Sequence, residues 1–178
     1  QYLPASSYSL VHQAQVNGRN RGVFSFCMCP GGIIAPAATA PGELVVNGWS
    51  PSKRNNPFAN SGMVVAVDVE DAVKELRKFK SLERLVPKDL EVENNPLLMM
   101  KFQQAVEQHC FTAGGGKLIA PAQRMVDFSN KKLSTSLPVC SYQPGLHSVQ
   151  LNEVLPGFIY SALAKGFKEF GKKMSAGS

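Results

Sequence analysis

The segment from Phe24 to Gly32 restricts the fold most, because it alternates like a strand and then breaks at Pro30-Gly31-Gly32. Successive side chains of a strand point to opposite faces, so alternation would place Cys27 and Cys29 on the same face. Proline fixes one φ angle, and the two glycines are free to adopt positive φ. A backbone of this kind can approach a flat ligand closely. The segment therefore predicts either the wall of a site with redox-capable thiols or an ordinary strand end with two small buried residues.

Five strands are expected in the first third of the chain, joined by turns rich in glycine and proline. These runs are residues 8–12, 22–29, 33–37, 43–48 and 63–67. Asn17-Gly18 between the first two runs is a strong hairpin signal. Because the loops are short, consecutive strands are expected to pair in an antiparallel meander. The polar loop from Trp49 to Gly62 is longer, and it fits either a functional loop or a plain surface crossover.

Helical periodicity dominates the remainder of the chain. Apolar residues at helical spacing predict helices over residues 68–80, 95–109 and 156–173. The predicted fold class is α+β, in which an antiparallel β-meander or barrel-like sheet supports a helical C-terminal part. A single domain is expected over residues 1–174, β-rich over 7–67 and mainly helical over 68–174, with a tail at 175–178.

The composition fits a packed core, since 44% of the 178 residues are hydrophobic and 18% are charged. The formal net charge is +6, and part of the excess lies at Lys165, Lys168, Lys172 and Lys173. Such an excess suits an anionic partner, but no aromatic residues interleave with the charges, so a solvated face is favoured over nucleic acid. No signal peptide or run of membrane-spanning length is visible. A cytoplasmic protein with reduced cysteines and no membrane contact is therefore expected.

The sequence lacks established catalytic and metal-binding patterns. Its cysteines and histidines do not have zinc-ligand spacing, so no metal is predicted, and Gly114-Gly115-Gly116-Lys117 is not followed by the rest of a phosphate-binding loop. No serine-hydrolase elbow or catalytic carboxylate pair is present. Cys27 and Cys29 are candidates for a catalytic thiol, although spacing places no histidine beside either of them.

Gln123 and Arg124 form a donor-rich pair after the rigid segment Ala120-Pro121-Ala122. Arg124 could hold a carboxylate or phosphate in a bidentate contact, or it could pair with Asp127 on the surface. Spacing leaves both interpretations open.

Four segments together resemble those of the large FAD-dependent dehydrogenase-like flavoproteins, often labelled NAD(FAD)-utilizing dehydrogenases. Residues 26–32 resemble the FCMCPGG segment of that family, and Val46-Asn47-Gly48-Trp49-Ser50 is similar to VNGxS. Residues 60–65 are similar to ANSxxVV, and residues 115–128 resemble GGxxxAPAQRxxDF. The likeness runs from about residue 3 to about residue 173.

The resemblance implies a substrate-binding or cap domain of an FAD-dependent oxidoreductase, a dehydrogenase, without its FAD-binding domain. The GxGxxG fingerprint of a dinucleotide-binding domain does not occur, and Gln1 is not a translation start, so the chain is expected to be a piece of a larger flavoprotein. Its cofactor would be FAD, with NAD(P)H as a candidate reductant, and its partner the missing domain of the same polypeptide. The isolated chain would be inactive. The alternative function is a basic module that binds an anionic partner such as nucleic acid.

The resemblance also implies which residues form the site. The cofactor-facing residues are Cys29, Pro30, Gly31, Gly32, Asn60 and Ser61. The candidate contacts to a small-molecule substrate are Arg54, Gln123 and Arg124. A glycine turn permits close approach, and polar groups tune a flavin or orient a substrate. Trp49 and a longer turn at 17–21 depart from the family pattern, and both would alter the fit of a substrate.

Overall fold

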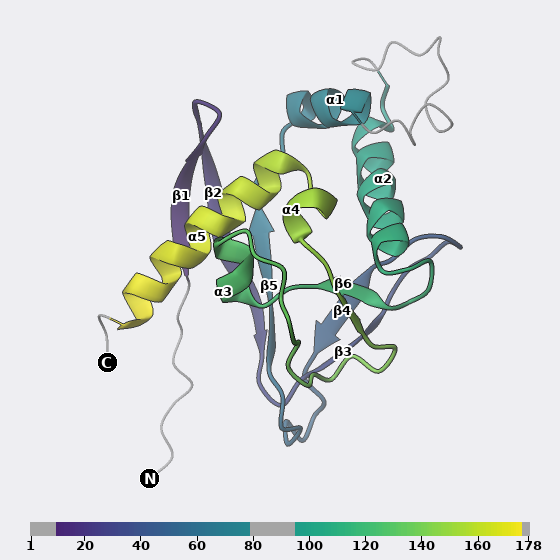
Figure 1. The fold of residues 1–178 in the computed structure, drawn as a ribbon, viewed down its shortest axis with the longest axis vertical. Coiled ribbons are helices and arrows are strands. Elements are labelled where there is room, and N and C mark those ends of the chain that lie inside the picture. Colours follow the sequence, from purple (N-terminus) through teal and green to yellow (C-terminus); the bar gives the residue numbers. More distant parts are fainter. Residues whose placement is uncertain (1–9, 79–94, 176–178) are drawn as a thin grey trace.

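The computed structural model describes residues 10–78 and 95–175. Its strands are β1 (Val11–Val16), β2 (Arg19–Cys29), β3 (Ile33–Pro36), β4 (Val46–Trp49), β5 (Asn60–Val65), β6 (Ala120–Ala122) and β7 (Leu146–Ser148). Its helices are α1 (Val69–Lys78), α2 (Leu98–Ala113), α3 (Met125–Ser129), α4 (Leu151–Val154) and α5 (Gly157–Ser175). The sheet lies in the N-terminal part and most helices in the C-terminal part (Figure 1), so the fold is mixed α+β.

The main sheet has three antiparallel strands in the order β1-β2-β5. Asn17 and Gly18 connect β1 to β2 with φ angles of 52° and 76°. Positive φ at both positions is typical of the two-residue turns whose twist matches a hairpin. Strands β3 and β4 form a separate antiparallel pair, in which Ile33 faces Trp49. Strands β6 and β7 form a short parallel pair.

The predicted α+β class, with an antiparallel N-terminal sheet and a helical C-terminal part, is confirmed. The meander order is wrong in two respects, because β3 does not pair with β2, and β5 pairs with β2 and not with β4. The long loop before β5 gives the chain enough length for this return. The three predicted helices are found as α1, α2 and α5. Positions 8–9 of the first predicted strand, 79–80 of the first predicted helix and 176–178 of the tail lie outside the described residues.

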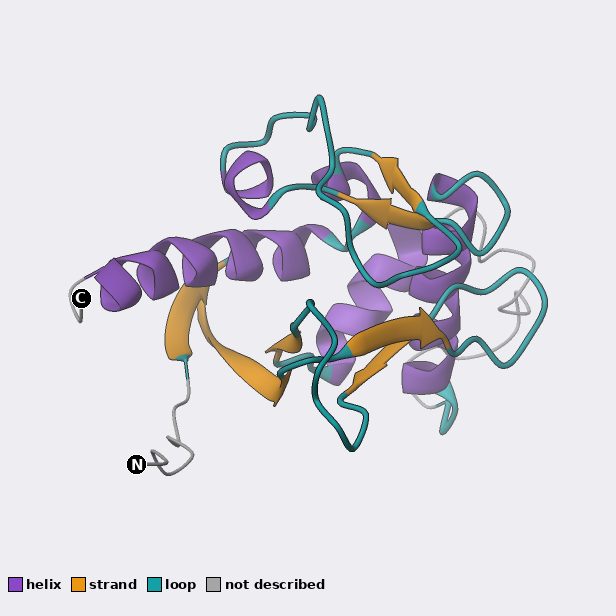
Figure 2. Ribbon diagram, turned by 90° about the horizontal axis from the view of Figure 1, so that it is seen from below, coloured by secondary structure: helices purple, strands orange, loops and turns teal. Residues whose placement is uncertain are grey.

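Helix α5 crosses one face of the main sheet and closes the core (Figures 1 and 2). Gly166 allows a close approach, since a Cβ atom there would lie 2.7 Å from Val23 Cγ1. Val23 is completely buried beneath the helix. The buried core cluster consists of Ala14, Val16, Val23, Ala72, Val73, Leu76, Leu98, Phe102, Ala105, Phe158, Ala162 and Phe170.

A buried ion pair connects β2 to α1 within this core. The Arg21 guanidinium donates two hydrogen bonds to the Asp71 carboxylate, at 2.5 and 2.6 Å, and one to the Ala66 carbonyl at 3.2 Å. The side chains of Arg21 and Asp71 are 4% and 8% exposed. The ring of Phe158, from α5, has its centroid 4.6 Å from the guanidinium carbon. The pair therefore links the sheet to both α1 and α5.

Removing one partner of this pair should destabilise the protein strongly. Arg21→Met leaves the Asp71 carboxylate buried without its counter-charge, which should lower the free energy of unfolding by about 3–5 kcal/mol. The double variant Arg21→Met, Asp71→Leu should recover most of that loss, because neither charge of the pair is then left buried without the other. Urea denaturation of both variants measures the difference, and equal losses would contradict this account of the pair. Arg19→Met, at the exposed Arg19–Glu70 pair, is the matched control and should change stability far less.

Stability should also depend on pH through Asp71. Burial acts to raise the pKa of the Asp71 carboxyl, but hydrogen bonds from Arg21 and from the Asp68 N–H outweigh it, and the pKa lies below its ordinary value of 3.8. The folded protein therefore binds this proton more weakly than the unfolded chain. The stabilisation is complete above about pH 5, and it is lost as the pH falls through the ordinary pKa of 3.8 and then through the lower pKa of the folded state. Urea midpoints measured across this range should fall more steeply for the wild type than for the double variant.

Candidate functional site

The Pro30-Gly31-Gly32 turn, β4 and the start of β5 converge on the side chain of Asn60. The Asn60 amide donates a hydrogen bond to the Ile33 carbonyl at 3.2 Å. A side chain at Gly32 would overlap the Nδ2 atom of Asn60, and one at Gly48 would overlap its Oδ1 atom. Three of the four sequence motifs thus meet in one packed unit, which we call the Asn60 cluster (Gly32, Gly48 and Asn60).

The loop between β4 and β5 holds the turn in place. The Gly32 N–H donates a hydrogen bond to the Phe58 carbonyl at 2.8 Å. The Ser50 hydroxyl donates another to the Pro30 carbonyl, also at 2.8 Å. The long loop therefore braces the turn, and a functional role of the loop itself stays a prediction.

Gly31, like Gly32, leaves no room for a side chain, and it also has a positive φ. Its φ is 58°, and a side chain there would overlap the backbone of Arg54. No described residue accepts a hydrogen bond from the Gly31 N–H. Arg54 itself has a φ of 46°, and its exposed guanidinium makes no ion pair with any described residue. The turn thus presents one free backbone donor next to one free cation.

Ser61 follows Asn60 in β5 and lies on the β2 side of the cluster. Its hydroxyl donates a hydrogen bond to the Phe26 carbonyl at 3.3 Å. The side chains of Asn60 and Ser61 are therefore both engaged with backbone carbonyls. Their assignment to cofactor contact, like that of the turn residues, stays a prediction.

Large apolar side chains next to the turn are exposed. Phe26 is 58% exposed, Met28 is 50% exposed and Trp49 is 43% exposed. Phe26 and Met28 precede the turn on β2, and Trp49 pairs with Ile33 just after it. Each of these side chains is large and apolar, and contact with another molecule or domain would remove it from water.

The alternation expected for Cys27 and Cys29 is broken. A bulge interrupts the β2–β5 pairing between Phe26 and Met28, and Cys27 has a φ of 48° at that bulge. A bulge adds one residue to a strand, so side chains on either side of it no longer keep the simple alternation. Cys27 is exposed, whereas Cys29 is half-buried with its sulfur 3.9 Å from the Gly48 carbonyl oxygen. The prediction that alternation places both thiols on one face is therefore wrong.

Gln123 belongs to a separate hydrogen-bond network. Its amide donates to the Lys132 carbonyl at 2.6 Å and accepts from the Leu151 N–H at 3.0 Å. Both ends of the side chain therefore hold the loop after α3 against the start of α4. Among the residues that the structure describes, no hydrogen bond or ion pair joins Gln123 to the Asn60 cluster. Its role as a substrate contact stays a prediction.

Arg124 has an exposed side chain and no ion pair with Asp127. The Ser134 hydroxyl donates a hydrogen bond to the Asp127 carboxylate at 2.8 Å. The same hydroxyl accepts a hydrogen bond from the backbone N–H of Arg124 at 2.9 Å. Of the two interpretations of Arg124, the surface pair with Asp127 is thus not found. Its guanidinium is free to meet an anion.

Sequence reasoning missed Gly48, Ser50 and Ser134. Gly48 and Ser50 lie in the Val46–Ser50 motif, but their contacts depend on pairing between segments far apart in the chain. Ser134 lies in no motif, although it is buried and its hydroxyl organises the start of α3. No signal in the sequence could have singled it out.

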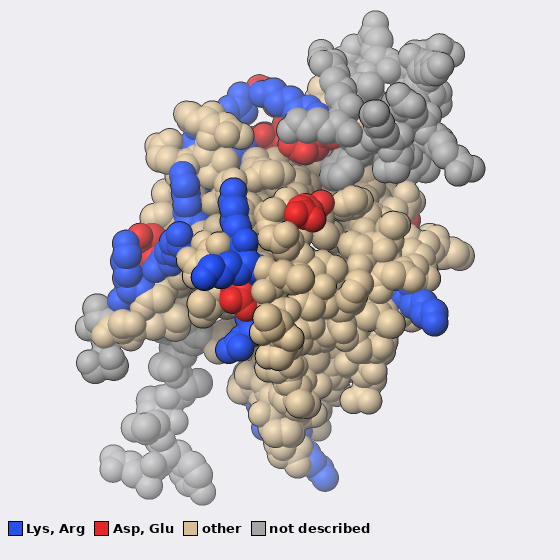
Figure 3. Space-filling view, in the orientation of Figure 1, with Lys and Arg blue, Asp and Glu red and all other residues tan. Residues whose placement is uncertain are grey.

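The basic residues of α5 gather on one side of the molecule (Figure 3). Lys165 and Lys173 donate hydrogen bonds to backbone carbonyls of β1, and Lys172 pairs with Glu169. These three ammonium groups are therefore engaged with their own chain. The alternative function, binding of nucleic acid or another anionic partner, stays a prediction.

Metal-ligand clusters and membrane spans were sought in residues 10–78 and 95–175. No three His, Cys, Asp or Glu side chains there are grouped to hold a metal ion. None of the helices in these ranges has the length and apolar character needed to cross a bilayer.

Comparison with known proteins identifies the family to which the chain belongs. A family model described as "FAD-dependent protein, C-terminal domain-like" matches residues 1–177. The chain belongs to this family of FAD-dependent proteins, as the resemblance predicted; the dehydrogenase subfamily stays a prediction. A Clostridium beijerinckii protein that carries the name "Uncharacterized protein" is 38% identical over 174 residues. The alignment covers 97% of this chain and 29% of that relative, so the chain spans less than a third of the relative's length.

The Asn60 cluster predicts a specific energetic coupling. Gly48→Ala should lower the free energy of unfolding by about 1–3 kcal/mol, because the new methyl group overlaps the Asn60 amide. In an Asn60→Ala background the overlapping atoms are gone, so the same change should cost much less. A double-mutant cycle by urea denaturation measures this coupling. Additive losses would show that Gly48 and Asn60 do not constrain one another.

The thiols of Cys27 and Cys110 should differ in their reactivity toward iodoacetamide. Cys27 is exposed, whereas burial, with a smaller effect of Glu107, raises the pKa of the Cys110 thiol to about 11. Thiolate is the reactive form, so iodoacetamide near neutral pH should modify Cys27 well before Cys110. Mass spectrometry of tryptic peptides over time gives the order. Modification of Cys110 at the rate of Cys27 would contradict the packing of α2.

Proposed function

We propose that this chain is the cap domain of an FAD-dependent oxidoreductase and that it covers the flavin held by the rest of the polypeptide. The proposal includes a small-molecule substrate between the two parts, a cytoplasmic location and no activity for the isolated chain. The family match and the 29% coverage of the Clostridium relative support a larger FAD-dependent protein. A dehydrogenase reaction with NAD(P)H as reductant is part of the proposal on the sequence resemblance alone.

The observation that carries this proposal is the convergence of three motifs on Asn60. The turn is fixed by packing around Asn60 and by hydrogen bonds from and to the loop between β4 and β5. The free Gly31 N–H at its tip is a suitable donor to a flavin oxygen or ring nitrogen. The exposed rings of Phe26 and Trp49 beside it would be covered when the two parts meet. These features fit a surface that closes over a flat ring system.

The residues proposed to meet the cofactor are Cys29, Pro30, Gly31 and Gly32, with Asn60 and Ser61 behind them. Cys29 and Asn60 face one another across β2 and β5, so both lie at the same end of the main sheet. FAD would supply the hydride-accepting ring. The chain's own contribution would be to position that ring and to exclude water from it.

Arg54 and Arg124 are the proposed contacts to an anionic group of the substrate. Both side chains are exposed, and neither makes an ion pair within the described residues. Gln123 is the third proposed contact to the substrate, and its amide also makes hydrogen bonds with two backbone groups.

The division of labour can be tested by flavin content. The isolated chain should purify without the flavin absorbance band and should not bind added FAD tightly. A chimaera in which this chain replaces the matching part of the Clostridium relative should purify with FAD. Tight stoichiometric FAD in the isolated chain would overturn the proposal.

The same chimaera tests the surface. Phe26→Glu should raise flavin fluorescence or lower flavin content, because a charge then opposes closure over the ring. Val69→Glu is the matched control, since Val69 is 52% exposed and begins α1, beyond the end of β5 that lies away from the turn. Equal effects of the two changes would count against the turn as the flavin-facing edge.

A further inference from the structure

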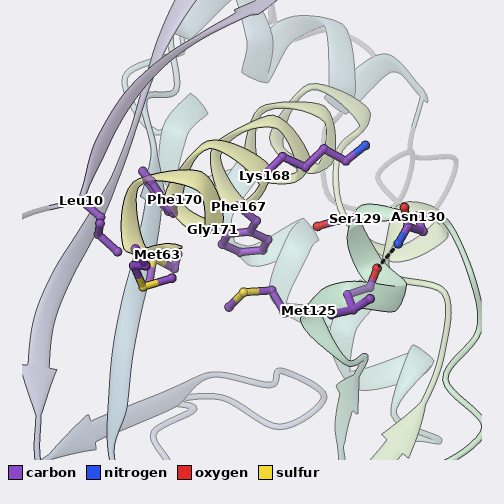
Figure 4. Close-up of a pocket in the computed structure, with 11 residues that line it drawn as sticks. Leu10, Met63, Met125, Ser129, Asn130, Phe167, Lys168, Phe170 and Gly171 are labelled. Atoms are coloured by element: carbon purple, nitrogen blue, oxygen red, sulfur yellow. Dashed lines mark hydrogen bonds between the residues drawn. The ribbon is translucent and has the colours of Figure 1, made fainter. Parts of the chain in front are cut away.

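A hollow lies between the main sheet, α3 and α5 (Figure 4), and the residues of the Asn60 cluster do not line it. Its volume is about 330 Å³, within the range of small-molecule sites. The apolar walls include Leu10 and Met63 on the sheet side, Met125 of α3 and Phe167 of α5. In Figure 4 the methionine side chains of Met63 and Met125 face one another across the space below α5. Methionine adapts readily to the shape of an apolar ligand.

Gly171 leaves part of this hollow open. Glycine is a poor helix former, so a glycine inside α5 calls for a physical reason. Gly166 has one, because a side chain there would collide with Val23. At Gly171 a Cβ atom would meet nothing within 4 Å. No packing in the structure therefore excludes a side chain at this position, and the free space is available to a molecule from outside the chain.

The polar side chains that line the hollow are those of Lys168, Ser129 and Asn130. Among the described residues that line it, Lys168 is the one ionisable residue; it is exposed and makes no ion pair with a described residue. In Figure 4 its ammonium group lies at the outer edge, whereas the Ser129 hydroxyl points into the space below α5. The Asn130 amide is occupied by the Val126 carbonyl at 2.9 Å. An apolar interior with one free cation at its rim is complementary to an amphipathic anion.

The wall of the hollow next to Lys168 is formed by tightly packed side chains of α5. Phe167 packs on Phe128 with ring centroids 5.4 Å apart, and Phe170 is 2% exposed. Helix α5 is held to β1 by Lys173, which donates a hydrogen bond to the Val11 carbonyl at 2.6 Å. The hollow is therefore bounded mainly by packed helices and strands, with Leu10 and Asn130 at the ends of such elements.

We propose that this hollow binds a small extended apolar molecule that ends in one anionic group, a carboxylate or a sulfonate. The apolar body lies against Met63, Met125 and Gly171, and the anionic end reaches Lys168. This site is separate from the flavin-facing turn, and the proposal does not depend on the proposed function.

The test uses the 178-residue chain with anilinonaphthalene sulfonate, a fluorescent apolar anion, as the probe. One probe molecule should bind per chain, and decanoate should displace it. Gly171→Met should fill the hollow and weaken probe binding at least about tenfold. Gly157→Met is the matched control, because Gly157 also has nothing within 4 Å but does not line the hollow, and it should leave binding unchanged.

Lys168→Met tests the anionic end separately. The concentration of decanoate needed to displace the probe should rise about fivefold, and the concentration of neutral decanol needed should not change, because only the carboxylate interacts with the ammonium group. Near-ultraviolet circular dichroism of each variant shows that the fold is retained. The proposal is overturned if Gly171→Met binds the probe like the wild type, if decanoate fails to displace it at about 1 mM, or if Lys168→Met affects decanoate and decanol equally. Failure of flavin capping in the chimaera would leave this result unaffected.

Discussion

The buried pair of Arg21 and Asp71 is the constraint on which the positions of the other elements depend. Two charges inside a core are tolerated only when they satisfy one another, so β2, α1 and the Phe158 end of α5 must meet in one arrangement. Strand β2 is 11 residues long and is buried at Arg21 and Val23. Its later residues pass into an exposed region. The same strand thus anchors the core at one end and presents the candidate site at the other.

Strand register explains why three sequence motifs form one site. The β2–β5 pairing places Cys29 opposite Asn60, and the β3–β4 pairing places Ile34 opposite Gly48. The Asn60 amide then fills the space between the two pairs, where any side chain at Gly32 or Gly48 would overlap it. The glycines and the asparagine are therefore required together. Their physical role is to set the position of the turn, and the proposed contact with a cofactor would fall to the atoms that the turn exposes.

Local signals in the sequence were sufficient for much of the fold and insufficient for its connections. Asn17-Gly18 predicted the hairpin because a two-residue turn needs positive φ at both positions, and apolar spacing located the three long helices. The return of β5 to β2 and the bulge at Cys27 could not be predicted, because both depend on which distant strand pairs with β2. The site divides in the same way. The motifs located the turn. The hydrogen bonds of the Gln123 side chain could not be predicted in this way, because they are made with the backbone of residues 132 and 151.

Strand β5 is common to the turn and to the hollow below α5. Asn60 belongs to the cluster that sets the turn, and Met63, three residues further along the strand, lines the hollow. A strand rises about 3.3 Å per residue, so the two backbone positions are about 10 Å apart. Because β5 pairs with β2 over its length, the strand connects them rigidly. Both surfaces are therefore built on one regular element that α5 holds against the core. That arrangement suits a domain whose task is to position ligands, since strands locate side chains more accurately than loops do.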